Sequence, residues 1–511
     1  MILKLGGKLT LLVLYLVSFG FLFSTPYLVE YPVDDEASYV EQTKLLLSGK
    51  TQPNWLLSTS YLTMLAGMPI IQHAFSFFNL RLLMMIIAAT TTPLMYLLLR
   101  EFDVKKSIAI LGAFVLITSP FVAVHLRQFI TEPISLPLYL ASTLLIVKGI
   151  KVGSNRYLLL GALVGVLGFL NRQIDIIPAM AAFLFFVLHG NVLSRLKLNV
   201  LADVARKIEN LSYGFLSIDK KSAIKQPFKK LLSISPALIF LIVFLLYMVL
   251  TAGNVTNPIT VPTSKHHVLQ DPQFGISLQS PYRLLQDVIY LGFMFLPFAP
   301  FIWKHIRPKF SILGKHIDSK KFLLAGSLFI GFLAALSGKA FIVHSDALII
   351  MIVTAAFSYG GLSLLLLIMH NRARSKIINY CFIVLIVCIV FTFFKISIFI
   401  IKYYIIFLPF ILVFLATRIK EKTPYILTVL LLGGFGILLT INSIQFYNIV
   451  WSNISELISQ GVEPTNIQGQ YTVVNWLVHR VDNPSAEYTI VWENDRLFNE
   501  FVNLSSIKIV S

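Results

Sequence analysis

Three consecutive carboxylates, Asp34, Asp35 and Glu36, directly follow the first long apolar run, in the stretch EYPVDDEASYVEQTKLLLSGK. Carboxylates repel one another and gain nothing from lipid, so acids placed at membrane depth tend to be functional. Such a group can accept a proton from a hydroxyl or bind a cation. The alternative is structural. A helix between Pro32 and Gly49 would be capped by an acid at its start, and its positive end would favour the others.

Two further polar clusters follow apolar runs. In HLRQFITEPISLPLY, Glu132 follows Arg127 and precedes Pro133, which suits the first turn of a helix and places Glu132 at the helix start. In FLNRQIDIIP, Arg172 and Asp175 lie between two short apolar runs. The structural alternatives are a helix cap for Glu132 and a local ion pair between Arg172 and Asp175.

Lysines form a fourth cluster in FKISIFIIKYYIIFLP, where Lys395 and Lys402 lie at span ends, and snorkelling to lipid headgroups is the structural alternative. Cations and carboxylates beside an apolar crevice suit a lipid phosphate, with cations for the phosphate and a carboxylate for proton transfer. His266 and His267 are expected to be solvated loop residues. A divalent metal is possible, but no histidine-rich ligand set demands one.

The elements that must position these residues are membrane helices. The chain has 511 residues, of which 57% are apolar and 13% charged, and this is too few charges for the shell of a soluble protein. Apolar runs of about 20 residues recur along most of the length. We expect an all-α polytopic membrane protein with about 13 transmembrane helices: Leu9–Leu28, Leu80–Leu99, Ile108–Val124, Pro133–Val147, Tyr157–Leu170, Ile176–Leu188, Leu232–Leu250, Leu284–Trp303, Phe322–Leu336, Ala347–Met369, Ile377–Phe394, Ile401–Ala416 and Tyr425–Ile441.

The basic residues predict the orientation. With the N-terminus inside, most of the 42 Lys and Arg residues fall in inner segments, and the C-terminus lies outside. The formal charge of +18 is therefore explained by the membrane, and no nucleic-acid partner is expected. The inner segments are Lys4–Lys8, Arg100–Lys106, Lys148–Arg156, Arg195–Lys230, Lys304–Lys321, Arg372–Lys376 and Arg418–Lys422.

This orientation holds only if residues 55–78, although apolar, do not cross the membrane, so we expect them to lie in the outer interface. The first outer loop then covers residues 29–79 of a transmembrane domain spanning residues 1–441. The polar segment 442–511 is expected to be a small outer α/β appendage, with a helix over YTVVNWLVHRV and a strand over EYTIVW.

The order of these features resembles the GT-C membrane glycosyltransferases. The chain is most similar to the dolichyl-phosphate-mannose protein mannosyltransferases and the aminoarabinose transferases. The likeness rests on DEASYVEQTKLLLSGK, NLRLLMMIIAATTTPLMYLLLREF, RQFITEP, GVLGFLNRQ and KYYIIFLPFIL, in that order. It covers residues 1–190 well and the rest only in architecture. The chain departs from the family pattern at Glu132, where Asp is common, and at Lys402, where Arg is usual and would offer a bidentate fork.

The resemblance implies transfer of a sugar, with inversion, from a polyprenyl- or dolichyl-phosphate donor on the outer or lumenal face. Asp35 would then be the catalytic base, and Glu36 would orient the acceptor or a water. Glu132 would position the acceptor or share a metal.

The donor phosphate would be held by cations, because phosphate is already a good leaving group. These cations would be Arg172, Arg127 and Lys402, with Asp34 and Tyr39 as possible donor or acceptor contacts. Three acceptor classes fit this reaction: a protein, a lipid or a glycan. A prokaryotic cell membrane is favoured over the endoplasmic reticulum.

Two alternatives stay open. A transporter or flippase of lipid-linked glycans would recognise the same headgroup, although paired halves and charges at span centres are absent from the sequence. A ligase or polymerase of lipid-linked glycans would also use a lipid phosphate.

Overall fold

The structure is a computed structural model. It describes residues 2–24, 29–33, 35–49, 60–189, 227–252, 288–289, 291–305, 309–312, 315–337, 347–370, 375–394, 405–463, 467–468, 488–492 and 507–510.

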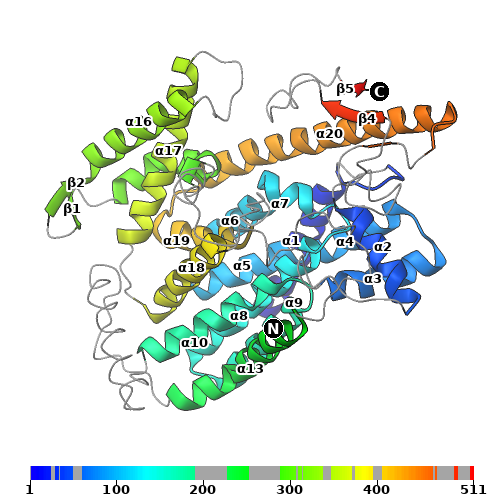
Figure 1. Ribbon diagram of the computed structural model, residues 1–511. Helices are drawn as coiled ribbons and strands as arrows, with labels where there is room; N and C mark the ends of the chain where they lie inside the picture. Colours follow the sequence, from blue (N-terminus) through cyan, green and yellow to red (C-terminus); the bar gives the residue numbers. More distant parts are fainter. Residues whose placement is uncertain are drawn as a thin grey trace.

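The described part of the chain is a bundle of helices (Figure 1). The α-helices are α1 (Ile2–Phe23), α2 (Glu36–Leu47), α3 (Tyr61–His73), α4 (Phe77–Ala88), α5 (Thr91–Glu101), α6 (Lys106–Thr118), α7 (Pro120–His125), α8 (Glu132–Val152), α9 (Asn155–Phe169), α10 (Ile177–His189), α13 (Pro227–Ala252), α15 (Ala299–Ile302), α16 (Ser319–Ser337), α17 (Ala347–His370), α18 (Lys376–Phe394), α19 (Leu408–Arg418) and α20 (Thr423–Ser459). Short 3-10 helices are η1 (Gln173–Ile176), η3 (Leu296–Phe298) and η4 (Trp303–His305).

These helices confirm a polytopic membrane protein built mainly from α-helices. Five helical stretches of the described chain are long and apolar enough to cross a membrane: Phe77–Glu101, Glu132–Val152, Pro227–Phe244, Met351–Ile368 and Thr423–Ser459. Six shorter apolar helices accompany them. The expected number of about 13 spans stays a prediction, because length and composition alone mark only the five.

The α4–α5 stretch shows how one predicted span is built. It breaks at Ala89–Thr90, where Pro93 cannot donate to the carbonyl four residues earlier. Phe77–Glu101 nevertheless provides 25 residues, about 38 Å of helix, which is enough to cross the hydrocarbon core. By contrast, α3 has 13 residues, about 20 Å, and is not among the stretches that are long and apolar enough to cross. It packs against α2 and α4 at one end of the bundle (Figure 1).

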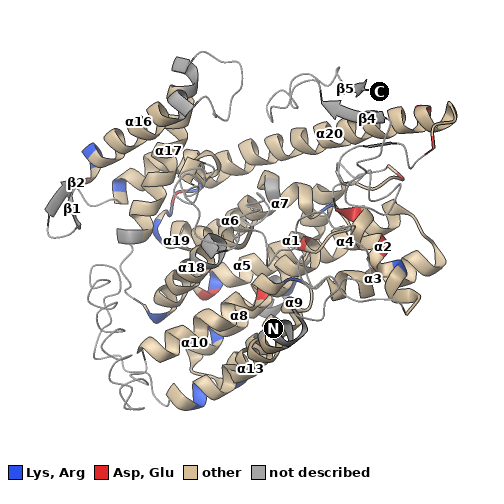
Figure 2. Ribbon diagram, viewed as in Figure 1, with Lys and Arg blue, Asp and Glu red and all other residues tan. Residues whose placement is uncertain are grey.

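Basic residues from segments far apart in the sequence meet at the opposite end of the bundle. Lys151 donates to the carbonyl of Glu101 and to Asp103 Oδ1, at 2.6 and 3.2 Å. Lys420 lies near Lys105 and Arg418, and its pKa is lowered by partial burial and by these two charges. Figure 2 shows basic residues on α13 and α16, and acidic residues on α2 and at the far end of α20. Three of the segments assigned to the same side, Arg100–Lys106, Lys148–Arg156 and Arg418–Lys422, therefore lie together, while the orientation itself stays a prediction.

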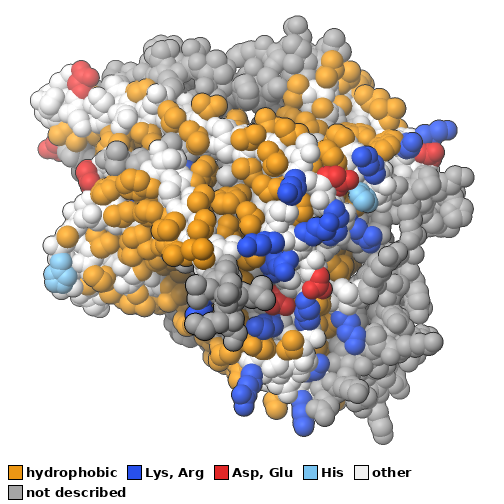
Figure 3. All heavy atoms as spheres, turned by 180° about the vertical axis from the view of Figure 1, so that it is seen from behind, with side chains coloured by type: hydrophobic (Ala, Val, Ile, Leu, Met, Phe, Trp, Pro, Cys, Tyr) orange, Lys and Arg blue, Asp and Glu red, His pale blue; other side chains and the backbone are white. Residues whose placement is uncertain are grey.

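The outer surface of the bundle is apolar. Leu9, Leu12 and Leu16 of α1 are 61%, 54% and 55% exposed, and Leu232 and Ile242 of α13 are 73% and 62% exposed. Seen from behind, hydrophobic side chains form a broad area, and Lys and Arg gather along one side of it (Figure 3). Leucines exposed in this density fit a surface that faces lipid.

Helix α20 is longer than the predicted span Tyr425–Ile441. Its 37 residues correspond to about 55 Å, nearly twice the hydrocarbon thickness. It packs against α6 and α7. We call residues 442–459, which continue beyond the predicted span, the α20 extension.

The described chain also contains short strands, two before α16 and three after α20. The strands β1 (Lys309–Ile312) and β2 (Lys315–Asp318) form an antiparallel hairpin before α16. After α20, β3 (Ile467–Gln468) pairs parallel to β4 (Tyr488–Trp492), which pairs antiparallel to β5 (Ile507–Val510). The helix predicted over YTVVNWLVHRV lies outside the described residues, so the α/β appendage stays a prediction.

Candidate active site

The start of α8 and the end of α9 bring Glu132 and Arg172 together. Glu132 opens α8 with Pro133 in the first turn, as the sequence predicts. Arg172 follows α9 in an extended conformation, and its Nη1 forms an ion pair with Glu132 Oε1. The side chains are 7% and 2% exposed, so both charges are almost fully removed from solvent. A pair this well buried depends on good geometry to offset its desolvation.

The sequence suggests a local ion pair between Arg172 and Asp175, but in the structure Arg172 pairs with Glu132. Asp175 Oδ1 instead accepts a hydrogen bond from Ser135 Oγ at 2.6 Å, one turn after Glu132 on α8. The reason is geometric: η1 directs Asp175 towards α8, while Arg172, in extended backbone before η1, reaches the helix start.

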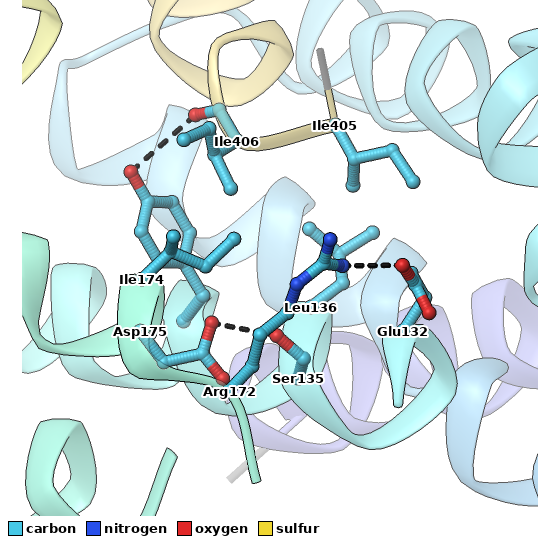
Figure 4. Close-up of a pocket in the computed structure, with 9 residues that line it drawn as sticks. Glu132, Ser135, Leu136, Arg172, Ile174, Asp175, Ile405 and Ile406 are labelled. Atoms are coloured by element: carbon cyan, nitrogen blue, oxygen red, sulfur yellow. Dashed lines mark hydrogen bonds and ion pairs between the residues drawn. The ribbon is translucent and has the colours of Figure 1, made fainter. Parts of the chain in front are cut away.

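A pocket opens at this pair. It is small, with a cavity volume of about 10 Å³, and it is lined by Glu132, Ser135, Leu136, Tyr139, Arg172, Ile174, Asp175, Ile405 and Ile406. Figure 4 shows the Arg172 guanidinium reaching towards Glu132, with Ile405 and Ile406 facing the same space from another segment. The pocket therefore combines the charged pair with the polar side chains of Ser135, Tyr139 and Asp175 and with apolar side chains.

A third part of the pocket lining, besides α8 and the turn after α9, comes from the KYYIIFLPFIL segment. Ile405 and Ile406 come three and four residues after Lys402, and Tyr139 donates to the Ile406 carbonyl at 3.4 Å. Lys402 itself lies outside the described residues. RQFITEP, GVLGFLNRQ and the residues that follow Lys402 thus meet at one pocket.

Asn171 joins the same turn to the first outer loop, and the sequence analysis missed it. Its Oδ1 accepts from the amide and the hydroxyl of Thr63, at 3.0 and 2.8 Å, near the start of α3. Its Nδ2 donates to the Thr131 carbonyl at 2.8 Å, next to Glu132. The available signal was an asparagine next to Arg172 at the end of an apolar run.

Glu36 lies in a second buried ion pair, with Arg81 of α4. Arg81 Nε and Nη2 donate to the two oxygens of Glu36 at 2.9 and 2.5 Å, and both side chains are fully buried. The same carboxylate accepts from the amides of Val33 and Phe129, each at 2.8 Å. Because its bonds go to these protein donors, Glu36 connects the segment before α2 to α4 and to Phe129, between α7 and α8. This placement differs from the expected one, in which Glu36 faces an acceptor or a water.

Asp35 occupies the position before α2, but its side chain makes no capping hydrogen bond to the helix. The helix start is therefore confirmed, while the capping role is not seen for this residue. Tyr39, one turn into α2, is half-buried beside a cluster that includes Phe77 and Phe129. Asp34 lies outside the described residues.

Arg127 lies apart from the pocket lining. Its guanidinium donates to the carbonyls of Leu22, Phe21 and Ala123, at 2.8, 3.0 and 2.7 Å. It also donates to Thr440 Oγ1 of α20 at 3.3 Å. Arg127 thus binds the last turn of α1 to α7 and α20, which differs from the predicted phosphate contact.

One comparison with known proteins bears on this geometry. Residues 60–204 match the family model described as dolichyl-phosphate-mannose-protein mannosyltransferase. The chain resembles this mannosyltransferase family. The match contains Glu132, Asn171 and Arg172, so the resemblance seen in the sequence is confirmed over residues 60–204, which supply the pocket lining from α8 and from the turn after α9. No curated protein matches the chain.

A match to the mannosyltransferase family indicates a membrane glycosyltransferase that uses a lipid-linked sugar. Within the described residues, no three His, Cys, Asp or Glu side chains gather as a metal site would require. The chemistry available at the pocket is that of a guanidinium for an anion, a carboxylate beside it, and apolar walls for a lipid chain.

Proposed function

We propose that the protein transfers a sugar from a polyprenyl- or dolichyl-phosphate carrier to an acceptor hydroxyl. The observation that supports this most directly is the pocket at Glu132 and Arg172. Its charged pair lies beside apolar side chains, as a phosphate headgroup attached to an isoprenoid requires. Its walls come from three segments that resemble motifs of the mannosyltransferase family.

Arg172 binds the donor phosphate in this proposal. A guanidinium presents five N–H donors in a planar fork, of which Nη1 faces Glu132. Leu136, Ile405 and Ile406 contact the first isoprenoid unit. Lys402 supplies a second positive charge, as a point charge without the fork. Arg127 supports the site from a distance, because its described hydrogen bonds go to main-chain carbonyls and a threonine.

Asp35 is the general base. The acceptor oxygen attacks the anomeric carbon while Asp35 takes its proton, and the bond from that carbon to the phosphate oxygen breaks. The electron pair leaves with the phosphate, where Arg172 stabilises the negative charge. A single displacement inverts the anomeric centre. Glu36 fixes the turn that carries Asp35, and Glu132 orients Arg172 and the acceptor.

The expected topology belongs to the same proposal: about 13 spans, the N-terminus inside, and the C-terminal α/β appendage outside. It is supported by the gathering of basic segments at the end of the bundle away from α2 (Figure 2). The reaction then takes place on the outer or lumenal face, in a prokaryotic cell membrane.

The test is made with purified protein in liposomes that contain a labelled polyprenyl-phosphate sugar. We expect sugar transfer to an added acceptor, or slow hydrolysis, with release of the lipid phosphate. The exposed Arg156, at the other end of α9 from Arg172, gives the control variant Arg156→Ala, which should keep full activity.

Other outcomes separate the alternatives. Movement of intact donor across the bilayer without bond cleavage would contradict the proposal and indicate a flippase. Transfer only to a lipid-linked glycan would identify the ligase or polymerase. Chelation of divalent cations in the same assay determines whether a metal is needed.

A further inference from the structure

The α20 extension contacts the short segment that leads into the acidic turn. The rings of Trp451 and Tyr31 stack with centroids 5.6 Å apart and an interplanar angle of 30°. Trp451 Nε1 donates to the Pro32 carbonyl at 3.2 Å. The Tyr31 hydroxyl donates to Asn448 Oδ1, one turn before Trp451 on the helix. A residue more than 400 positions later in the sequence therefore binds the backbone three residues before Asp35.

The same segment is held on its other side by the enclosed ion pair. Arg81 donates to the carbonyls of Val29 and Tyr31, at 2.5 and 2.7 Å, and Glu36 accepts from the amide of Val33. Three side chains therefore form hydrogen bonds with main-chain groups of residues 29–33: the guanidinium of Arg81, the carboxylate of Glu36 and the indole of Trp451. A turn bound from two sides has few alternative conformations.

The contact with the extension is an apolar core of its own. Val450, Trp451, Ile454 and Leu457 are buried together, with Tyr31 packed against them. Burial raises the pKa of Tyr31 to about 12, although the nearby Arg81 charge opposes this rise. The hydroxyl therefore stays protonated and can donate to Asn448 throughout the neutral range.

We propose that Trp451 is a positioning residue that fixes the location of the Asp35 carboxylate through Pro32 and Tyr31. This inference rests on the proposed function, in which Asp35 is the base. It makes the α20 extension part of the catalytic apparatus, rather than only a connection to the C-terminal strands. Misplacing a catalytic group by about 1 Å can lower a rate by about 10²-fold, so the loss of one anchor should be measurable.

The experiment compares Trp451→Phe with Ser452→Ala, its exposed neighbour, in the liposome transfer assay. Trp451→Phe keeps an aromatic ring but loses the hydrogen bond to Pro32. We expect kcat to fall about tenfold at an unchanged donor KM, because the donor pocket is formed by other residues. Asn448→Ala, on an exposed position, should lower kcat about threefold with little risk to folding. Ser452→Ala should match the unaltered protein.

A double-mutant cycle then tests whether Trp451 acts through Asp35. In an Asp35→Asn background, Trp451→Phe should lower the remaining rate by less than about twofold, because the group it positions no longer accepts a proton. An equal tenfold loss in both backgrounds, a rise in donor KM, or unchanged kcat in both variants overturns the inference while the proposed function stands. Full activity of Asp35→Asn alone overturns the proposed base, and the inference with it.

Discussion

Two buried arginine–glutamate pairs differ in what surrounds them. Glu36 and Arg81 are both fully buried, and the carboxylate accepts two bonds from the guanidinium and two from main-chain amides. Glu132 and Arg172 pair at the edge of a pocket, with side chains 2% and 7% exposed and apolar walls beside them. The first pair is enclosed by protein, whereas the second borders a small cavity.

The difference shows that burial of an ion pair does not by itself identify a functional site. Breaking an enclosed pair leaves one charge without compensation, so the cost appears in folding. A pair beside a pocket can exchange part of its interactions for a ligand, so removing it should lower binding and rate as well as stability. Each prediction below contrasts these two outcomes.

The largest effect is expected for Asp35→Asn, next to the enclosed pair. The amide keeps the shape of the side chain but cannot accept a proton at neutral pH. Loss of a general base costs about 10²–10⁴-fold in rate, or roughly 3–5 kcal/mol in the barrier. The measurement is sugar transfer per folded protein, with Glu41→Gln on the same helix as the control. If Asp34→Asn is inactive and Asp35→Asn is active, the base lies in this acidic turn but is Asp34 instead of Asp35.

Replacing Arg81 tests the enclosed pair. Arg81→Leu leaves the Glu36 carboxylate buried without its counter-charge, and we expect unfolding to become easier by about 3–5 kcal/mol. The measurement is thermal unfolding in detergent together with the yield of monodisperse protein. The double variant Arg81→Leu with Glu36→Leu should recover part of the loss. A well-folded Arg81→Leu protein that has lost only donor binding would reverse the roles of the two pairs.

A smaller loss of stability and donor binding is expected at Gly168, which packs against Asp175 of the pocket lining. A Cβ added at Gly168 would lie 2.6 Å from the Cβ of Asp175, so Gly168→Ala must displace Asp175 and its bond to Ser135. Overpacking of this kind costs about 1–3 kcal/mol, and we expect lower thermal stability and a higher KM for the donor. Gly434→Ala, in α20 with nothing within 4 Å, should be neutral. Unchanged behaviour of Gly168→Ala would show that Asp175 is not fixed by this packing.

The sequence predicts which polar residues lie at helix ends better than it predicts which residues they pair with. Pro133 marks the start of α8, and Arg172 stands out as a cation between apolar runs, so both were found. The partner of Glu36 was missed, because Arg81 lies 45 residues away and is brought close only by packing. Its signal was a charge at the start of an apolar helix, which needs a counter-charge.

The α20 extension was missed for a different reason. Predicting spans by hydropathy ended the helix at Ile441, where the apolar run ends. A helix can continue outside the membrane when one side finds an apolar partner, and Val450, Ile454 and Leu457 have the spacing of one helical face. The role of Arg127 could not be predicted, because carbonyls at the end of α1 leave no trace in side-chain patterns.

The most direct test of the central claim is the affinity of purified protein for a polyprenyl phosphate when Arg172 is replaced. A charge-assisted hydrogen bond contributes about 1.5–3 kcal/mol, so we expect the folded Arg172→Ala protein to bind about 10–100-fold more weakly, together with some loss of stability because Glu132 loses its counter-charge. Arg172→Lys should recover only part of the affinity, and Arg156→Ala should lose none. Unchanged affinity of a folded Arg172→Ala protein would contradict the account and leave Arg172 as the structural partner of Glu132.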